Sequence, residues 1–235
     1  MENLDGESGP AVAEGLTDRA FARLHAAILG GELQPGTSVV EIELVERFGL
    51  TRAPARAAVS RLVQEGWLVA QSRRRIVVRP ITLRDVREVF DLRMQLEPEA
   101  ARRAAGRVDA DLLNQLDDQT AGNYNPNDPS EEAEFFKANA KLHVAIARAA
   151  GNARAAMLIE KLHDESQRIL RVGMRYTNWS RNWQHGHRDL IAALTDGDGE
   201  KAAEIALRQL QNSERVVMDA LNDMFDSVAL GDLRK

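Results

Sequence analysis

The chain has 235 residues, 44% of them hydrophobic, which is enough for one large domain or two modest ones. It has no cysteine, which excludes disulfide bonds and thiolate metal sites. The acidic, glycine-rich start MENLDGESGPAVAEG is the reverse of a signal peptide, and no apolar run is long enough to span a membrane, so we expect a cytoplasmic protein without a membrane partner.

The formal net charge of −5 is distributed unevenly. Residues 1–16 carry four acids and no base, a charge of −4. Residues 17–80 carry ten Arg and six acids, a charge of +4, and residues 81–235 carry 21 Lys or Arg and 26 acids, a charge of −5. The basic residues are therefore concentrated in residues 17–80, as expected of a segment that binds nucleic acid.

The chain begins with an arm and a helix. We expect residues 1–16 to be disordered and an amphipathic helix to follow over Thr17–Leu29, with a core face formed by Phe21, Leu24, His25 and Ile28. We interpret His25 as a core or dimer-side histidine rather than a ligand. Gln34-Pro35-Gly36 places proline and glycine at the central positions of a type II turn. A short strand is predicted at Ser38–Val40.

Residues Glu41–Gly66 have the pattern of a helix-turn-helix. Gly49 ends the first helix, and Thr51 is expected to cap the second. The opposite side of the second helix is small or hydrogen-bonding, and Arg52 and Arg56 near its start can reach phosphates or guanine edges. The residues predicted to face the core are Ile42, Leu44, Val45 and Phe48 in the first helix, and Ala55, Ala58, Val59 and Leu62 in the second.

A β-hairpin is predicted directly after Gly66. Trp67–Gln71 and Ile76–Val78 have the composition of its two strands, and Ser72 to Arg75 form a basic tip. A hairpin behind a recognition helix is a wing, and three arginines at its tip suit the phosphate backbone or the minor groove.

The segment that contains the helix-turn-helix and the wing resembles a known family. GELQPG followed by EIELVERFGLTRAPARAAVSRLVQEGWL is similar to the winged-helix domain of GntR-type bacterial transcription regulators, over about residues 17–80. The family often has glycine at the wing tip, which this chain lacks. The resemblance implies contact with double-stranded DNA through Thr51, Arg52, Ala53, Pro54, Arg56, Ser60, Arg73, Arg74 and Arg75.

Residues 81–235 show no strand pattern. Thr82 with Asp85 resembles a capping box that opens a helix, and the short connections between helices favour an antiparallel bundle. The predicted fold is therefore mainly α: an N-terminal winged helix-turn-helix with a small β-wing, then a six-helix antiparallel bundle. The six predicted helices are 83–105, 110–122, 130–150, 153–175, 180–196 and 199–229.

Four of these helices carry polar residues within their apolar faces. Burial of a polar group without a partner costs roughly 1–3 kcal/mol. One alternative is that each residue is satisfied separately, for example by an ion pair between Arg93 and Glu97. Because the pattern recurs on four helices, we favour a central polar pocket formed by Arg93, Asn139, His143, His187 and Gln209.

The order of features between residues 93 and 209 resembles the FCD ligand-sensing domain of the FadR subfamily, a helical bundle with an effector pocket. LRMQLEPEAA is similar to its first helix, where an arginine at position 93 is associated with a carboxylate effector. NAKLHVAIARAAGN and HRDLIAAL are similar to its metal-binding segments, which implies Asn139, His143 and His187 as metal ligands. ALRQL places Gln209 at the fourth ligand position.

This chain departs from the metal-binding pattern at two positions, since Asn139 replaces an acid and Gln209 replaces a histidine that many members have. Zn²⁺ and Ni²⁺ prefer imidazole and carboxylate to a neutral amide oxygen. We therefore expect any divalent metal to bind weakly, and the five pocket residues to hold the effector directly.

Several other polar residues of the helical unit are not assigned to the pocket. Glu160 and His163 have the E-x-x-H spacing of di-iron bundles, but the motif occurs once and His163 is placed at the edge of its helix face. We interpret His185 as exposed, and Arg168, Arg171 and Arg175 as a solvated face.

These patterns predict a ligand-responsive, homodimeric transcription regulator rather than an enzyme, and the resemblance implies repression as the commoner outcome. Two recognition helices related by a two-fold axis would read a pseudo-palindromic operator, and the effector would change their separation or mobility. Two alternatives remain open. One is a helical metalloenzyme with His143 and His187 as ligands, although we see no acid on those faces to act as a base. The other is a ligand-independent architectural DNA binder.

Overall fold

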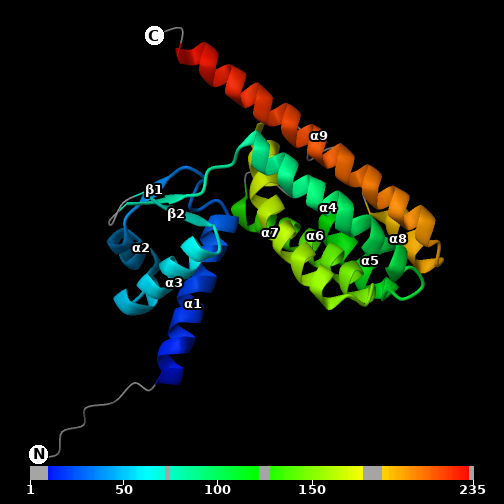
Figure 1. The fold of residues 1–235 in the computed structure, drawn as a ribbon, viewed down its shortest axis with the longest axis horizontal. Coiled ribbons are helices and arrows are strands. Elements are labelled where there is room, and N and C mark those ends of the chain that lie inside the picture. Colours follow the sequence, from blue (N-terminus) through cyan, green and yellow to red (C-terminus); the bar gives the residue numbers. More distant parts are fainter. Residues whose placement is uncertain (1–9, 72–74, 122–127, 177–186, 233–235) are drawn as a thin grey trace, which may run out of the picture. The chain divides into compact units, whose positions relative to one another are not determined.

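The structure is a computed structural model that describes residues 10–71, 75–121, 128–176 and 187–232 (Figure 1). The chain separates into two compact units, Met1–Ile81 and Thr82–Lys235, each with its own hydrophobic core. Among the described residues, no helix is both long and apolar enough to cross a bilayer.

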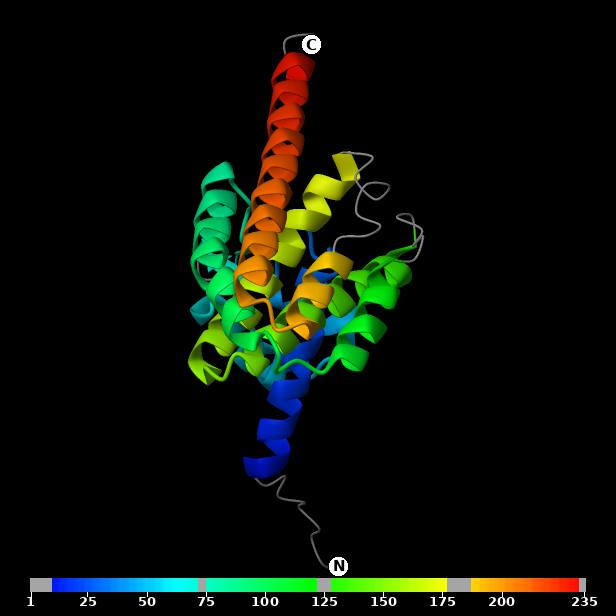
Figure 2. The same ribbon diagram turned by 90° about the vertical axis from the view of Figure 1, so that its right-hand side faces the viewer.

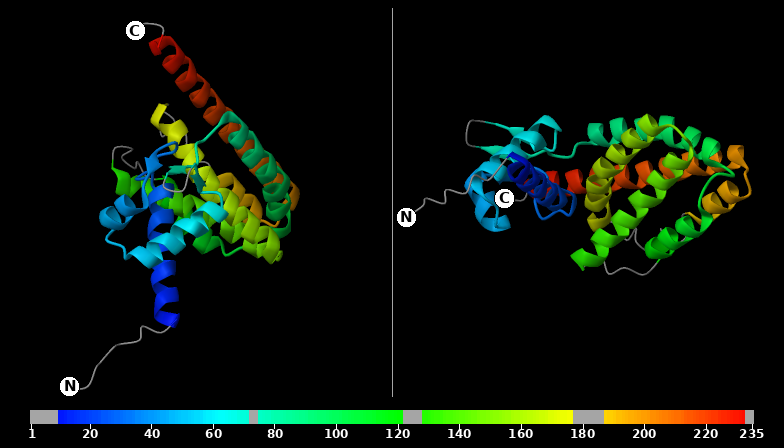
Figure 3. Two further views of the ribbon diagram at one scale, coloured as in Figure 1. Left: turned by 60° about the vertical axis from the view of Figure 1, so that its left-hand side comes forward. Right: turned by 90° about the horizontal axis from the view of Figure 1, so that it is seen from below.

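The first unit has a winged-helix fold (Figure 3). The sheet order is β1-β3-β2 with antiparallel pairing throughout, and Val77 of the central strand lies opposite both Ser38 and Val69. The short strand predicted before the helix-turn-helix therefore does pair with the wing. The elements are α1 (Pro10–Leu29), β1 (Ser38–Val39), α2 (Glu41–Phe48), α3 (Arg52–Gln64), β2 (Leu68–Ala70) and β3 (Ile76–Val78).

The core of this unit forms where the helical periodicity predicted it. His25 stacks on Phe21 with ring centroids 5.5 Å apart and meets the edge of Trp67 at 4.6 Å, so it is a core histidine. Gly36 has a φ of 81°, and Thr37 N donates to Gln34 O over 3.1 Å, which confirms the type II turn. The buried side chains of the three helices include Leu24, Ile28, Leu44, Ala55, Ala58, Val59 and Leu62.

Three details of this unit differ from the prediction. Helix α1 begins at Pro10, so residues 10–16 are helical rather than disordered; proline is favoured at the first helical position, and alanines follow it. Ile42 is 43% exposed, because Leu44 supplies the buried contact of the eight-residue α2. Thr51 is the N-cap of α3 but makes no side-chain capping bond, since the third helical residue is Pro54, which has no amide hydrogen.

The second unit contains six helices in the part of the chain that the structure describes, as predicted. Helices α4 and α9 lie side by side along the bundle (Figures 1 and 2). A Cβ on Gly199 would lie 2.7 Å from the carbonyl oxygen of Arg102, so glycine is required where α9 starts against the end of α4. The helices are α4 (Leu83–Ala104), α5 (Ala110–Ala121), α6 (Pro129–Ala149), α7 (Ala153–Tyr176), α8 (Arg188–Thr195) and α9 (Gly199–Asp232).

The described part of the fifth predicted helix begins at Arg188, and its expected start at residue 180, with His185, lies outside the described residues. The interpretation of Arg168 and Arg171 as solvated is wrong, because they are 7% and 4% exposed. Arg171 pairs with Glu132 of α6, and its guanidinium lies 5.0 Å from the ring centre of Phe136. Helix α7 packs against α4, α6 and α9, and over residues 168–171 every side chain is buried.

The predicted capping box at the start of α4 is present. Asp85 N donates to Thr82 Oγ1 over 3.1 Å, and Thr82 N donates to Asp85 Oδ2 over 2.9 Å. Because Thr82→Ala removes the first of these bonds, we expect it to lower the free energy of unfolding by about 1 kcal/mol in urea denaturation. Thr51→Ala is the matched control, an N-cap threonine without a capping bond, and should change stability much less. Equal losses in the two variants would contradict this role for the side-chain bond.

Candidate functional site

Helix α3 presents one polar, exposed face. Thr51, Ala53 and Ser60 are exposed on it and Pro54 is half-buried, opposite the buried core face. Arg52 and Arg56 are exposed, and neither forms an ion pair or hydrogen bond with another described side chain.

Another arginine on the same helix is engaged within the protein. Arg61 binds Asp18 at 3.2 Å and Glu65 at 2.8 Å, and its guanidinium lies 3.8 Å from the ring centre of Phe21. The two arginines at the start of α3 are therefore the ones available to an external anion. In the wing, Arg75 is exposed, while Arg73 and Arg74 lie outside the described residues.

The interior of the second unit contains an ion pair that the sequence analysis considered only as an alternative. Arg93 and Glu97, one turn apart on α4, are 4% and 6% exposed. Arg93 Nε donates to Glu97 Oε1 over 2.6 Å, and Nη1 donates to Ser166 Oγ over 3.1 Å. The guanidinium is thus bound on two sides by groups of the protein itself.

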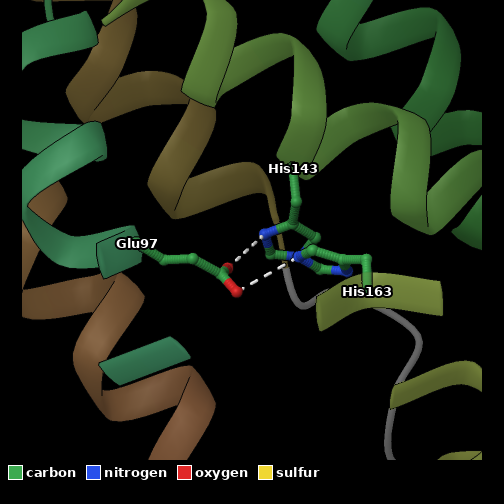
Figure 4. Close-up of side chains that lie close together, drawn as sticks. All are labelled: Glu97, His143 and His163. Atoms are coloured by element: carbon green, nitrogen blue, oxygen red, sulfur yellow. Dashed lines mark ion pairs between the residues drawn. The ribbon is translucent and has the colours of Figure 1, made fainter. Parts of the chain in front are cut away.

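Two imidazoles complete this group (Figure 4). His143 Nδ1 lies 3.1 Å from Glu97 Oε2, and His163 Nε2 lies 3.2 Å from Glu97 Oε1. His163 Nε2 is also 3.2 Å from Arg93 Nη2, and the rings of His143 and His163 stack with centroids 4.6 Å apart. Helices α4, α6 and α7 therefore meet at one buried carboxylate.

The protonation states follow from burial and neighbouring charge. Burial alone would raise the pKa of Glu97, but Arg93, His163 and His143 together hold that pKa well below its usual range. Burial, with the charge of His163, lowers the pKa of His143 to about 3 despite Glu97. Burial and Arg93 also lower the pKa of His163. At neutral pH the group therefore consists of one guanidinium, one carboxylate and two neutral imidazoles.

A second carboxylate–histidine pair lies beside the first. His187, the N-cap residue of α8, is 3% exposed, and its Nδ1 lies 3.0 Å from Oδ1 of the buried Asp117 on α5. Although burial opposes it, the hydrogen bond from His187 lowers the pKa of Asp117. The rings of His187 and His143 have centroids 5.2 Å apart. Three of the predicted pocket residues, Arg93, His143 and His187, thus belong to one connected cluster.

The two amide residues are placed less directly. Asn139 is 4% exposed, one turn before His143 on α6, and its Oδ1 has no hydrogen-bond partner among the described residues. Gln209 is half-buried on α9, one turn after Ala206. A cavity of about 10 Å³, the space of about one water molecule, lies against Glu97 and His143. Its other walls are apolar: Ala100, Ala101, Ile146, Ala147, Ile159, Leu190 and Ala206.

Four residues of the cluster were missed or undervalued by sequence reasoning. His163 is 2% exposed and central, not at the edge of its helix face. Glu97 and Asp117 are acids that the predicted pocket lacked, and Ser166 is a further residue of the cluster that no sequence pattern marked. The helical spacing of Glu97 after Arg93 was one available signal, and the position of Asp117 four residues after Leu113 was another. The other contacts join positions about 70 residues apart, such as His187 and Asp117.

A divalent metal fits this cluster poorly. The ligand atoms of Glu97, His143 and His163 lie within 4.8 Å of one another. The Arg93 guanidinium, however, already donates to Glu97 and lies against His163, so its positive charge would repel a metal cation bound there. On the side of His187, two imidazoles backed by carboxylates are an arrangement common at metal sites. The remaining family positions, however, supply the amides of Asn139 and Gln209, which are poor ligands for zinc or nickel.

We expect calorimetric titration with ZnCl₂ to show weak binding to the natural chain. The variant Asn139→Asp/Gln209→His replaces both amides by preferred ligands, and its affinity should rise by at least the roughly 10–100-fold typical of changes at metal sites. Tight, stoichiometric binding to the natural chain that is lost in His143→Ala would contradict this expectation.

An exposed, arginine-bearing helix beside a small wing, followed by a helical unit with a buried cluster of charged and imidazole groups, is the arrangement of a DNA-binding transcription regulator. Residues 16–78 match the gntR family of bacterial regulatory proteins, and residues 88–212 match the FCD domain. The chain belongs to the GntR family of regulators and carries an FCD domain; it is not an enzyme.

Individual relatives agree with this assignment. The chain is 26% identical over 213 residues to the HTH-type transcriptional regulator BphR of Paraburkholderia xenovorans, covering 86% of this chain and 85% of that protein. It is 25% identical over 196 residues to the HTH-type transcriptional repressor RspR of Escherichia coli, covering 82% and 86%. The solved structure of E. coli McbR/YncC matches 87% of this chain and 97% of that one, with a TM-score of 0.73 and 21% identity, which shows a shared fold.

Proposed function

We propose that this regulator belongs to the FadR subfamily and acts in the cytoplasm as a homodimer on a pseudo-palindromic operator. Its affinity for the operator changes when a small effector binds the polar cluster of the helical unit. Repression is the proposed outcome, in line with the name of its relative RspR. The pseudo-palindrome follows from the two-fold symmetry of a dimer, which places two α3 helices on half-sites about one helical turn, or a multiple of it, apart.

The observation that carries the DNA-binding role is the contrast among the arginines of α3. Arg52 and Arg56 are exposed and unpaired among the described residues, whereas Arg61 is bound to Asp18, Glu65 and Phe21. A cation that is not neutralised by the protein is what binding to phosphates or a guanine edge requires.

Arg56→Ala tests this role against Arg61→Ala on the same helix. Operators are first selected from random duplexes with the natural protein, and affinity is then measured by fluorescence anisotropy on selected and scrambled duplexes. Arg56→Ala should lose about 1–3 kcal/mol of discrimination between them, because a base contact is removed. Arg61→Ala should keep the discrimination. If Arg56→Ala loses equal affinity on the selected and the scrambled duplex, Arg56 does not read a base. If the selected sequences lack two-fold symmetry, the protein does not bind as a symmetric dimer.

The effector role is supported by the concentration of polar groups in the bundle. A core that served only to stabilise the fold would need no such groups, because each buried polar group requires a partner to offset the cost of its desolvation. The resemblance to ligand-sensing domains implied a carboxylate effector at Arg93. Such an effector would have to displace Glu97 from Arg93, where the distance is 2.6 Å. A ligand-independent DNA binder would show no change in operator affinity with any small molecule.

A further inference from the structure

The exposed face of α3 has small side chains at its centre and arginines at its edges. At 3.6 residues per turn, the exposed Ala53 and Ala57 point within about 30° of the direction opposite to the buried face of the helix. Arg56 lies about 70° to one side of that direction, and Arg61 about 70° to the other. The buried face consists of Ala55, Ala58, Val59 and Leu62. In its first two turns, the part of α3 that faces directly away from the core therefore carries methyl groups.

The other residues at the centre of this face are Ser60 and Gln64, and both are exposed. Gln64 is the last residue of α3 and lies about 10 Å along the helix axis from Ala57, at 1.5 Å per residue. In helix-turn-helix proteins, the N-terminal residues of the recognition helix contact the base edges. The exposed residues of that part of α3, from Arg52 to Ser60, include neither an amide nor a carboxylate side chain.

This composition limits the bases that α3 can read directly. In the major groove, adenine is recognised by the amide of Asn or Gln, and cytosine is recognised by a carboxylate. Arginine recognises guanine, and an apolar side chain recognises the C5-methyl group of thymine. With Arg56 at the edge of the face and Ala53 and Ala57 at its centre, guanine and thymine are the bases that these side chains match.

The small size of the two alanines permits such a contact. An alanine side chain ends at Cβ, so it touches a base only where the helix backbone itself lies close to the floor of the groove. Ala53 and Ala57 are one turn apart on the same side of α3, so no long side chain stands between the helix and the bases there. Contact between two methyl groups removes both from water, which favours a base with a methyl group over one without it.

We propose that Ala53 and Ala57 read thymine in the operator through contact with its C5-methyl group, which rests on the proposed binding of α3 to the operator. Each half-site then contains one or two thymines whose methyl groups lie against these alanines, next to the base pair that Arg56 contacts. The sequence preference of α3 thus combines an apolar contact at the centre of its exposed face with a polar contact at the edge.

The test replaces each thymine of one half-site in turn by deoxyuridine, which forms the same base pair but lacks the methyl group. The duplexes are operators selected with the natural full-length protein, and affinity is measured by fluorescence anisotropy. At one or two thymines, the replacement should weaken binding about fourfold, the factor that corresponds to burial of one methyl group. In Ala53→Gly or Ala57→Gly, the replacement at the thymine in question should have little effect, because the contact is already lost.

Ala22→Gly is the matched control, since Ala22 is an exposed alanine within helix α1 of the same unit. Glycine lowers helix stability at any of these positions. Each comparison, however, is between two duplexes bound by the same variant, so a change in the stability of the protein cancels. Ala22→Gly should therefore keep the fourfold difference between thymine and deoxyuridine that Ala53→Gly or Ala57→Gly loses.

Two outcomes overturn the thymine contact. One is that no thymine of the selected half-site shows a loss with deoxyuridine, and the other is that the loss is the same in the natural chain and in both glycine variants. If Arg56→Ala still loses discrimination on these operators, operator recognition by α3 stands and only the reading of thymine fails. If the natural chain selects no preferred sequence, the proposed operator recognition fails together with the thymine contact.

Discussion

Glu97→Ala is expected to lower the free energy of unfolding of the helical unit by about 3–5 kcal/mol, because it leaves the Arg93 guanidinium buried without its counter-charge. The same carboxylate also accepts from His143 at 3.1 Å and lies 3.2 Å from His163, so helices α4, α6 and α7 lose a common partner. Urea denaturation followed by circular dichroism measures the change.

The matched control is Glu99→Ala on the same helix. Glu99 forms an i,i+4 pair with Arg103 at 2.7 Å, as Glu97 is paired with Arg93, but it lies at the surface and its removal should change stability little. The double variant Arg93→Leu/Glu97→Leu should be more stable than Glu97→Ala, since no charge remains unpaired. If the double variant is as unstable as Glu97→Ala, the packing of these side chains, and not their charge, is what stabilises the bundle.

Periodicity was sufficient for most of the fold. In α3 the spacing of Ala55, Ala58, Val59 and Leu62 identified the buried face, because a helix of 3.6 residues per turn places these positions on one side. The capping box at Thr82 and the turn at Gly36 depend on neighbouring residues only, and both were correct. The missing cap at Thr51 was predictable in principle, since Pro54 stands where the donor amide was needed.

The site was predicted only in part, because its contacts join distant helices. A polar residue within an apolar face signalled Arg93, His143 and His187, and the structure brings these together. Asp117 was missed although it shares the buried side of α5 with Leu113 and Leu116. On this short helix the exposed Leu112 next to Leu113 leaves the apolar side poorly defined in the sequence. His163 was misplaced for a related reason. Its helix packs against three others, and from Leu162 to Arg171 no residue of it is exposed, so periodicity no longer separates inside from outside over that stretch.

Acidification should destabilise the helical unit before any carboxylate of the cluster is protonated. In the folded state the pKa of His143 is lowered to about 3, against a usual value of 6.5. Between these values the unfolded chain binds a proton that the folded chain does not, so stability is full above about pH 6.5 and falls as the pH decreases. From pH 7 to pH 5 this one histidine contributes a loss of about 2 kcal/mol, and His163 acts in the same direction.

Two carboxyl groups oppose this loss. One is Glu214, whose pKa is raised by burial and by Asp91, and the other is Asp164. Burial, with Glu160 and Glu165 nearby, raises the pKa of Asp164 to about 6, so the folded chain gains a proton there and acid stabilises it. Because two buried histidines act against two less buried carboxyl groups, the net effect below pH 6.5 remains a loss. Glu97 adds to this loss only at lower pH, since its pKa is depressed. In urea denaturation at several pH values, His143→Gln, which keeps an N–H donor for Glu97 but cannot titrate, should give a shallower dependence. An unchanged slope in that variant would mean that His143 already carries its proton in the folded protein, so that burial does not lower its pKa.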